Sequence, residues 1–225
     1  LGVERHARRG LRRRHGVEAE PADAALRDRH EPDRRGGDAR AGSLPTRIED
    51  VYVVILKEYK TIMENIFTEF FSDAEVKKIH VVYGDDTRQR SIQCANNYLR
   101  DQKIDDKDQI FVIDGVRPLV KEKLLEDMNN INKKENVVGC YTDCVSTILV
   151  KNDNFLHESL VRDKLAASHT PQIFKYGVFK KMYEQINTFD LDNETECLNL
   201  ALKYCNEKAY LLKTKEDEVM KITYN

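Results

Sequence analysis

The chain has 225 residues, a formal net charge of −2 and 34% charged side chains, and this length is ample for one domain with a sizeable core. It contains no apolar run of membrane-spanning length and no signal-peptide core, so we expect no membrane segment and a cytoplasmic protein. The five cysteines include no close C-x-x-C pair, which argues against a zinc or redox site of that type.

Residues 1–47 differ in composition from the rest of the chain. They carry twelve Arg, no Lys and eight acidic residues, a balance of +4, whereas residues 48–225 have a balance of −6. The first segment also lacks Ile, Phe, Tyr and Cys, so it cannot bury enough apolar surface to offset the entropy of folding. We expect a disordered or unrelated Arg-rich leader, followed by one domain over residues 48–225. A nucleic-acid arm is the alternative, but interspersed acids and missing aromatic residues disfavour a nucleic-acid partner.

From residue 51 the chain alternates between short apolar runs and runs with helical spacing. The expected elements are a strand at 51–56, a helix at 59–71, a strand at 78–83, a helix at 91–102, a strand at 109–113 and a helix at 119–132. Such alternation predicts parallel strands with helices on both faces of the sheet.

The pattern changes after residue 132. Three strand-like runs follow without a helix between them, at 137–141, 145–150 and 155–160, and the turn residues Lys151–Asn154 separate the last two. They predict a β-arm, at about residues 140–168, that projects from the sheet. The remaining expected elements are helices at 175–185 and 195–205 and strands at 210–213 and 219–224.

The run Ile110–Pro118, which reads I-F-V-I-D-G-V-R-P, joins a buried strand to an Asp and an Arg. In open α/β sheets ligands bind outside the carboxyl ends of strands, so Asp114 and Arg117 are expected to face a binding crevice. A carboxylate can hold a divalent metal and a guanidinium can hold a phosphate, which together suggest nucleotide chemistry. The alternative is a plain turn in which Asp114 accepts backbone amides and Pro118 opens a helix.

Three further segments accompany this run, namely Gly84–Ile92, Arg162 with Ser168–Gln172, and Met220–Thr223. In this order they resemble the cytidylyltransferase family that includes the 2-C-methyl-D-erythritol 4-phosphate and ribitol-5-phosphate enzymes, and the likeness runs from about residue 48 to the end. Thr87–Ile92 and Thr195–Cys205 are most similar to the animal ribitol-5-phosphate branch, which serves dystroglycan glycosylation. The resemblance implies a three-layer, Rossmann-like nucleotide-diphospho-sugar transferase fold with a projecting β-arm.

The same resemblance assigns roles to individual residues. Asp114 would bind the Mg²⁺ that bridges the nucleotide phosphates, and Arg117 and Lys221 would be the catalytic cations. The residues expected to contact the nucleotide are Asp85, Asp86, Arg88, Ser91, Asp114 and Arg117. Those expected to contact the sugar-alcohol phosphate are Arg162, Lys221, Thr170 and Thr195. Taken singly, Arg162 and Lys221 would more often be solvated surface charges. The other interpretation of Asp85–Ser91 is an N-cap box that opens a helix, and this is compatible with nucleotide contact.

The implied reaction transfers CMP from CTP to D-ribitol 5-phosphate and releases pyrophosphate. Because the attacking phosphate is already anionic near neutral pH, catalysis rests on positioning and positive charge rather than on a general base. One alternative is 2-C-methyl-D-erythritol 4-phosphate as the substrate, which belongs to isoprenoid biosynthesis. The other is a non-catalytic dimeric binding protein that keeps the fold. In the family the arm reaches across a two-fold axis, which implies a homodimer with Arg162 at a shared site.

One departure from the family concerns its opening strand and A-G-G-x-G-x-R-M loop, followed by P-K-Q, which wrap the CTP phosphates. This sequence has no such run, and its Gly36-Gly37 pair follows no apolar strand. We therefore expect a missing first strand, an unfilled sheet edge or groove beside 51–56, and little or no activity of the polypeptide as written. Smaller departures, where the family usually has His, Ala and Gly, are Ile113, Gly115 and Asp85.

Overall fold

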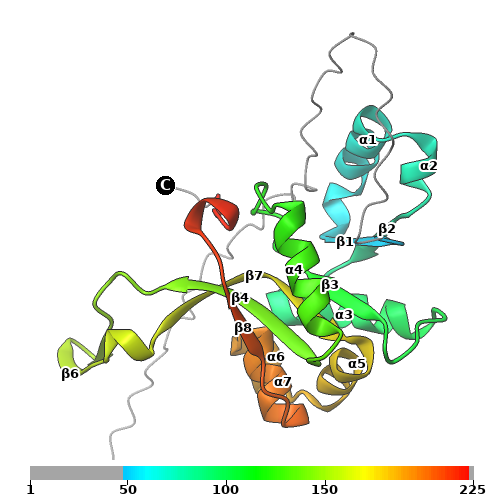
Figure 1. The fold of residues 1–225 in the computed structure, drawn as a ribbon. Coiled ribbons are helices and arrows are strands. Elements are labelled where there is room, and N and C mark those ends of the chain that lie inside the picture. Colours follow the sequence, from blue (N-terminus) through cyan, green and yellow to red (C-terminus); the bar gives the residue numbers. More distant parts are fainter. Residues whose placement is uncertain (1–47, 223–225) are drawn as a thin grey trace, which may run out of the picture.

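The computed structural model describes residues 48–222, whose body contains two sheets (Figure 1). β1 (Val51–Ile55) and β2 (Ile79–Tyr83) form a parallel two-stranded sheet. The second sheet has four strands in the order β3 (Gln109–Val112), β7 (Ala166–Lys175), β4 (Val137–Asp143) and β8 (Tyr210–Lys213). The expectations for the leader, including Gly36-Gly37, and for Thr223 lie outside the described residues.

Helices follow the strands closely along the chain. The α-helices are α1 (Lys60–Phe70), α2 (Asp73–Val76), α3 (Arg88–Arg100), α4 (Glu122–Asn132), α5 (Tyr176–Gln185), α6 (Thr188–Asn193) and α7 (Cys197–Cys205). The short 3-10 turns are η1 (Lys57–Tyr59), η2 (Arg162–Lys164) and η3 (Glu216–Glu218). No helix in this part of the chain combines the length and the apolar character that crossing a bilayer requires.

Helices lie on both faces of the four-stranded sheet (Figure 1), and a core layer lies between the sheet and the helices on each face. Because successive side chains of a strand point to opposite faces, Val137 and Phe174 pack with α5 and α7, whereas their neighbours Val138 and Ile173 pack with α4. All four side chains are fully buried, and each contributes about 1.5–3 kcal/mol of hydrophobic stabilisation. The three-layer α/β arrangement expected from the sequence is thereby confirmed.

β7 is the longest strand of the described chain, and the sequence analysis did not expect it. It runs antiparallel to both β3 and β4, so the parallel arrangement holds for β1 with β2 and for β4 with β8 only. The register on β4 moves from Gln172 to His169, which leaves Thr170 and Pro171 without partners on that strand. A proline cannot donate to a strand ladder, and this irregularity accommodates it.

Other boundaries differ from expectation. Residues 137–141 belong to the main sheet as β4, so the projecting arm is the antiparallel hairpin of β5 (Leu149–Asn152) and β6 (Phe155–Ser159) (Figure 1). The strand expected at 219–224 does not appear in its described portion, which follows η3 without forming a ladder. α2 and α6 were missed because each is short, although the cap residues Ser72 and Asn187 mark where they start.

The two sheets are not hydrogen-bonded to each other. Within residues 48–222, β1 bonds to β2 alone and β3 bonds to β7 alone, so each has one open edge. The open edge of β1 matches the expectation for the strand at 51–56. The β1–β2 sheet has its own small core, in which Val53 and Ile55 pack against Met63 and Phe67 of α1, and α3 contacts both strands.

Gly139 of β4 lies directly under Leu198 of α7. A Cβ added at Gly139 would overlap Leu198 Cδ1 and would lie 3.1 Å from Cδ2, and Leu198 is buried. We expect Gly139→Ala to lower the free energy of unfolding by about 1–3 kcal/mol, measured by urea denaturation. Adding Leu198→Ala opens space for the new methyl group. The double variant should therefore lose less free energy of unfolding than the sum of the losses in the two single variants. Strict additivity would contradict this packing argument.

Candidate functional site

Asp114 follows β3 at the carboxyl end of the strand, and its carboxylate lies between two guanidinium groups. Oδ1 accepts hydrogen bonds from Nε and Nη2 of Arg88, at 3.2 and 3.1 Å. Oδ2 lies 3.5 Å from Nε of Arg117. The backbone N–H of Asp114 donates to the hydroxyl of the buried Thr170, at 3.0 Å, which ties the end of β3 to β7.

The charges around Asp114 keep it ionised. Burial alone raises the pKa of this carboxyl group, because it disfavours the charged form. The positive charge and hydrogen bonds of Arg88, with further contributions from Arg117 and Lys221, outweigh burial and lower the pKa below its ordinary value. Asp114 is therefore a carboxylate at neutral pH, with 21% of its side chain exposed.

The C-terminal segment is fastened to the loop that follows β3. Arg117 is 7% exposed, and its Nη1 donates to the carbonyl of Val219. The N–H of Ile222 donates to the carbonyl of Val116 at 2.8 Å. Lys221 lies between these two attachment points, which explains why its charge acts on Asp114. The structure thus brings Arg117 against Asp114 and attaches to the same loop the segment that contains Lys221, which is 107 residues further along the chain than Asp114.

The loop between β2 and α3 closes on itself through Ser91. The Ser91 hydroxyl donates to the carbonyl of Asp85 at 2.9 Å and accepts from its N–H at 3.0 Å. A Cβ at Gly84 would lie 2.7 Å from Ser91 Oγ, so this close approach requires glycine. Thr87 caps α3 by accepting from the N–H of Arg90 at 3.2 Å. Asp85 and Asp86 are both exposed, so this part of the preformed loop is accessible to a ligand.

Arg162 lies apart from the other expected site residues. It belongs to η2 at the base of the arm, is exposed, and donates from Nη2 to the hydroxyl of Thr147 at 3.1 Å. In the described part of the chain no hydrogen bond or ion pair joins Arg162 to Asp114, Arg117 or Lys221. Within a single copy, Arg162 is therefore separate from the cations around Asp114.

A buried polar cluster behind Arg88 was missed by the sequence analysis. Nη1 of Arg88 donates to the carbonyl of the exposed Thr195 and to the thiol of Cys197, both at 3.2 Å. The Tyr183 hydroxyl donates to Oε1 of Gln89 at 2.6 Å and lies 3.6 Å from the Cys197 sulfur. These residues come from three helices with no motif spacing, and buried Cys and Tyr usually indicate ordinary core. Arg88 and Thr195 were expected site residues, but their connection through Cys197 could not be predicted from the sequence.

The residues around Asp114 fit a metal that arrives with a nucleotide. Within residues 48–222 no group of three or more His, Cys, Asp or Glu side chains is arranged to hold a metal ion. Mg²⁺ is commonly held by one or two carboxylates together with substrate phosphates. A single ionised and partly exposed carboxylate, beside cations that suit phosphate, matches that mode better than a resident metal site.

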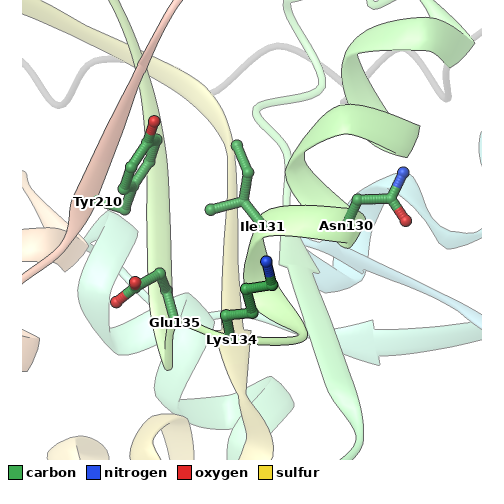
Figure 2. A pocket seen from close by; sticks show the side chains of 5 residues that line it. All are labelled: Asn130, Ile131, Lys134, Glu135 and Tyr210. Atoms are coloured by element: carbon green, nitrogen blue, oxygen red, sulfur yellow. The ribbon is translucent and has the colours of Figure 1, made fainter.

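A pocket elsewhere on the molecule is lined by Asn130, Ile131, Lys134, Glu135 and Tyr210 (Figure 2). It lies where α4 ends and where β4 and β8 begin. β3 and β4 are both antiparallel to β7, so they point the same way and this pocket lies at the opposite end of the sheet from Asp114. None of the expected site residues lines it.

Residues 40–225 match the family described as IspD: 2-C-methyl-D-erythritol 4-phosphate cytidylyltransferase. The chain is 36% identical over 183 residues to the D-ribitol-5-phosphate cytidylyltransferase of Xenopus tropicalis, covering 79% of this chain and 43% of that relative. It is 28% identical over 142 residues to the 2-C-methyl-D-erythritol 4-phosphate cytidylyltransferase of Clostridium novyi, covering 62% and 58%. The chain thus spans less than half the length of the Xenopus relative it matches.

Among solved structures, the 4-diphosphocytidyl-2C-methyl-D-erythritol synthase of Anaerococcus prevotii is similar in fold. The TM-score is 0.62 at 24% sequence identity, and the match covers 79% of this chain and 74% of that chain. This likeness supports the fold rather than the chemistry.

The lowered pKa of Asp114 predicts a pH-dependent stability difference for Asp114→Asn. The ionised group stabilises the fold above its unfolded pKa of about 3.9, and this contribution is lost as the pH falls through the lower folded value. We expect the variant to be less stable than the unaltered protein by about 1–3 kcal/mol near pH 7, because Arg88 loses a charged partner. Urea unfolding of both proteins from pH 7 to pH 3 should show the difference shrinking below about pH 4. A constant difference would contradict the assignment.

Proposed function

Because this chain belongs to the 2-C-methyl-D-erythritol 4-phosphate cytidylyltransferase family, we propose that it binds CTP at the Asp114 site and transfers CMP to a sugar-alcohol phosphate. The observation that carries this proposal is the convergence of Arg88, Asp114, Arg117 and Lys221 beyond the end of β3. In α/β folds ligands bind at the carboxyl ends of strands. The loop before α3 also follows the carboxyl end of a strand, β2.

The residues around Asp114 suit nucleotidyl transfer. Asp114 would hold a Mg²⁺ ion that arrives with the nucleotide, and the ion would supply positive charge to the nucleotide phosphates. Arg117 fixes the loop and the C-terminal segment, so that Lys221 presents a point charge where negative charge accumulates. A phosphate oxygen of the sugar alcohol attacks the α-phosphorus of CTP, and pyrophosphate leaves. Catalysis by this arrangement consists of positioning and charge, with no general base.

D-ribitol 5-phosphate is the favoured acceptor. The support is the higher identity, over a longer match, to the Xenopus ribitol-5-phosphate enzyme than to the Clostridium methylerythritol-phosphate enzyme. Activated ribitol made by such an enzyme would serve glycosylation of the dystroglycan type. All five cysteines are free, as is usual in the reducing cytoplasm, which supports a cytoplasmic site of action. The second candidate acceptor is 2-C-methyl-D-erythritol 4-phosphate.

The proposed enzyme is a homodimer that pairs through the arm. Leu149, Phe155 and Leu156 on the β5–β6 hairpin are 56%, 79% and 66% exposed, and clustered exposed apolar side chains commonly mark interaction surfaces. Arg162 at the base of this arm has no partner at the Asp114 site of its own chain. In the dimer Arg162 reaches the sugar phosphate bound by the other copy, which completes a set of cations that one copy does not assemble alone.

Substrate binding provides the test of the proposed site. Residues 1–225 contain no A-G-G-x-G-x-R-M run, so we expect weak pyrophosphate release, and binding measured by titration calorimetry is the informative readout. We expect CTP to bind more tightly with Mg²⁺ than without it, and Asp114→Asn to remove that Mg²⁺ dependence. Lys221→Ala should weaken binding of D-ribitol 5-phosphate about tenfold, which is about 1.4 kcal/mol.

Lys213→Ala is the matched control for Lys221→Ala, because Lys213 is also exposed but pairs with Asp143. It should leave both ligands unaffected. Failure of the unaltered protein to bind CTP with Mg²⁺ would refute the proposed function. Tighter binding of 2-C-methyl-D-erythritol 4-phosphate than of the ribitol compound would transfer the assignment to the second acceptor.

The dimer is tested by placing a charge on the arm. Phe155→Glu should shift the protein from dimer to monomer in sedimentation-velocity experiments, because burying an unpaired carboxylate in an apolar interface is unfavourable. Phe189→Glu is the control, since Phe189 is 71% exposed but lies on α6, away from the arm. A protein that is monomeric without substitution, or equal effects of the two variants, would contradict pairing through the arm.

A further inference from the structure

Most of the N–H donors of the Arg88 guanidinium bond to other protein atoms. Its guanidinium makes four hydrogen bonds, two to Oδ1 of Asp114, one to the Thr195 carbonyl and one to the Cys197 thiol. A guanidinium has five N–H donors in a rigid plane. The orientation of the Arg88 guanidinium is therefore fixed on one side by the Asp114 carboxylate and on the other by Thr195 and Cys197.

The two oxygens of Asp114 differ as a result. Oδ1 accepts both hydrogen bonds from Arg88. Oδ2 has Arg117 Nε as a neighbour at 3.5 Å, which is longer than a normal hydrogen bond of about 2.7–3.2 Å. Nε of Arg117 is buried and has no hydrogen-bond partner within the described residues. Oδ2 is accordingly the oxygen that remains available for a ligand.

The side chains that pack against Arg88 on the side away from Asp114 are buried and polar. Cys197 is 0% exposed and begins α7, and its sulfur lies within 3.7 Å of Nε2 of Gln89 and 3.6 Å of the Tyr183 hydroxyl. Gln89 is 1% exposed and Tyr183 is 3% exposed. Their mutual hydrogen bond of 2.6 Å fixes both side chains around the thiol. Cys197 thus has little freedom to move, and neither has the guanidinium that it contacts.

We propose that Arg88 is a positioning residue that holds Asp114 through Oδ1 and so leaves Oδ2 without a hydrogen bond, and that Cys197, supported by Gln89 and Tyr183, holds Arg88 in turn. This refines the expectation that Arg88 contacts the nucleotide directly. Its use, which rests on the proposed function, is to present one oxygen of fixed direction to a divalent cation that accompanies CTP. Groups that orient a metal ligand from behind commonly change metal affinity by about 10- to 100-fold when they are removed.

The test follows Asp114 itself, by ¹³C NMR titration of its carboxyl group in the full chain without nucleotide. The Asp114 signal is assigned by its absence in Asp114→Asn. Arg88→Lys keeps the positive charge but cannot engage both sides at once, so the pKa of Asp114 should rise by about one unit. Cys197→Ala should raise it less, in the same direction, and Cys197→Ser, which keeps a hydrogen-bonding group, should fall between Cys197→Ala and the unaltered protein.

Cys205→Ala is the matched control, because Cys205 ends the same helix that Cys197 begins and, within residues 48–222, its thiol donates to the Val178 carbonyl alone, at 3.7 Å. It should leave the Asp114 titration unchanged. An unchanged pKa of Asp114 in Arg88→Lys would overturn the role of Arg88, and equal behaviour of Cys197→Ala and Cys205→Ala would overturn that of Cys197. Thermal unfolding followed by circular dichroism identifies variants that are folded at the titration temperature.

A second readout links this positioning to metal binding. In calorimetric titrations of the CTP-saturated protein, Arg88→Lys and Cys197→Ala should each weaken Mg²⁺ binding, by about 10-fold or more for Arg88→Lys. The NMR titration contains no nucleotide, so absence of CTP binding would refute the proposed function while leaving the Asp114 result to be judged separately. Unaltered Mg²⁺ binding in Arg88→Lys, with CTP still bound, would overturn the positioning role.

Discussion

The contact between the Asp114 carboxylate and its two arginines is the constraint on which the candidate site depends. A partly buried carboxylate is costly unless it is paired and hydrogen-bonded. Here three segments meet at Asp114, because Arg88 belongs to α3, Arg117 belongs to the loop after β3, and the hydroxyl of Thr170 on β7 accepts from the Asp114 N–H. The C-terminal segment is attached through Arg117. Removing this one anion would leave two inward-facing cations without their common partner.

The sequence predicted the parts of this site that are local in the chain. Asp114 and Arg117 were identified because a short apolar run ends in a charged pair, and the structure places both at the end of β3. Lys221 was identified only by its resemblance to a family position, since nothing near it in sequence indicates that Val116 bonds to Ile222. Cys197 lies in a segment that resembles the family, but no role was assigned to it, because its contacts with Arg88 and Tyr183 depend on how three helices pack.

The fold shows the same limit. The apolar runs that became β1, β2 and β3 were identified from their composition, whereas β7 was missed because Ser168, His169 and Pro171 interrupt its alternation. Its burial comes from neighbours on both sides, β3 and β4, and such non-local pairing has no counterpart in a local pattern. The direction of a strand is also a tertiary property, which is why the antiparallel pairing of β3 was not foreseen.

The separation of the β1–β2 sheet from the four-stranded sheet has a dynamic consequence. The β1–β2 sheet keeps a separate small core with α1, and α3 contacts both of its strands as well as α5 and α6. Units with their own cores tend to open cooperatively, at a lower free energy than global unfolding. Local opening of residues 51–83 would leave the pairing of β3 with β7 intact, but it would act on the first turn of α3. Because Arg88 lies in that turn and bonds to Asp114, the opening would alter the ion pair of Asp114.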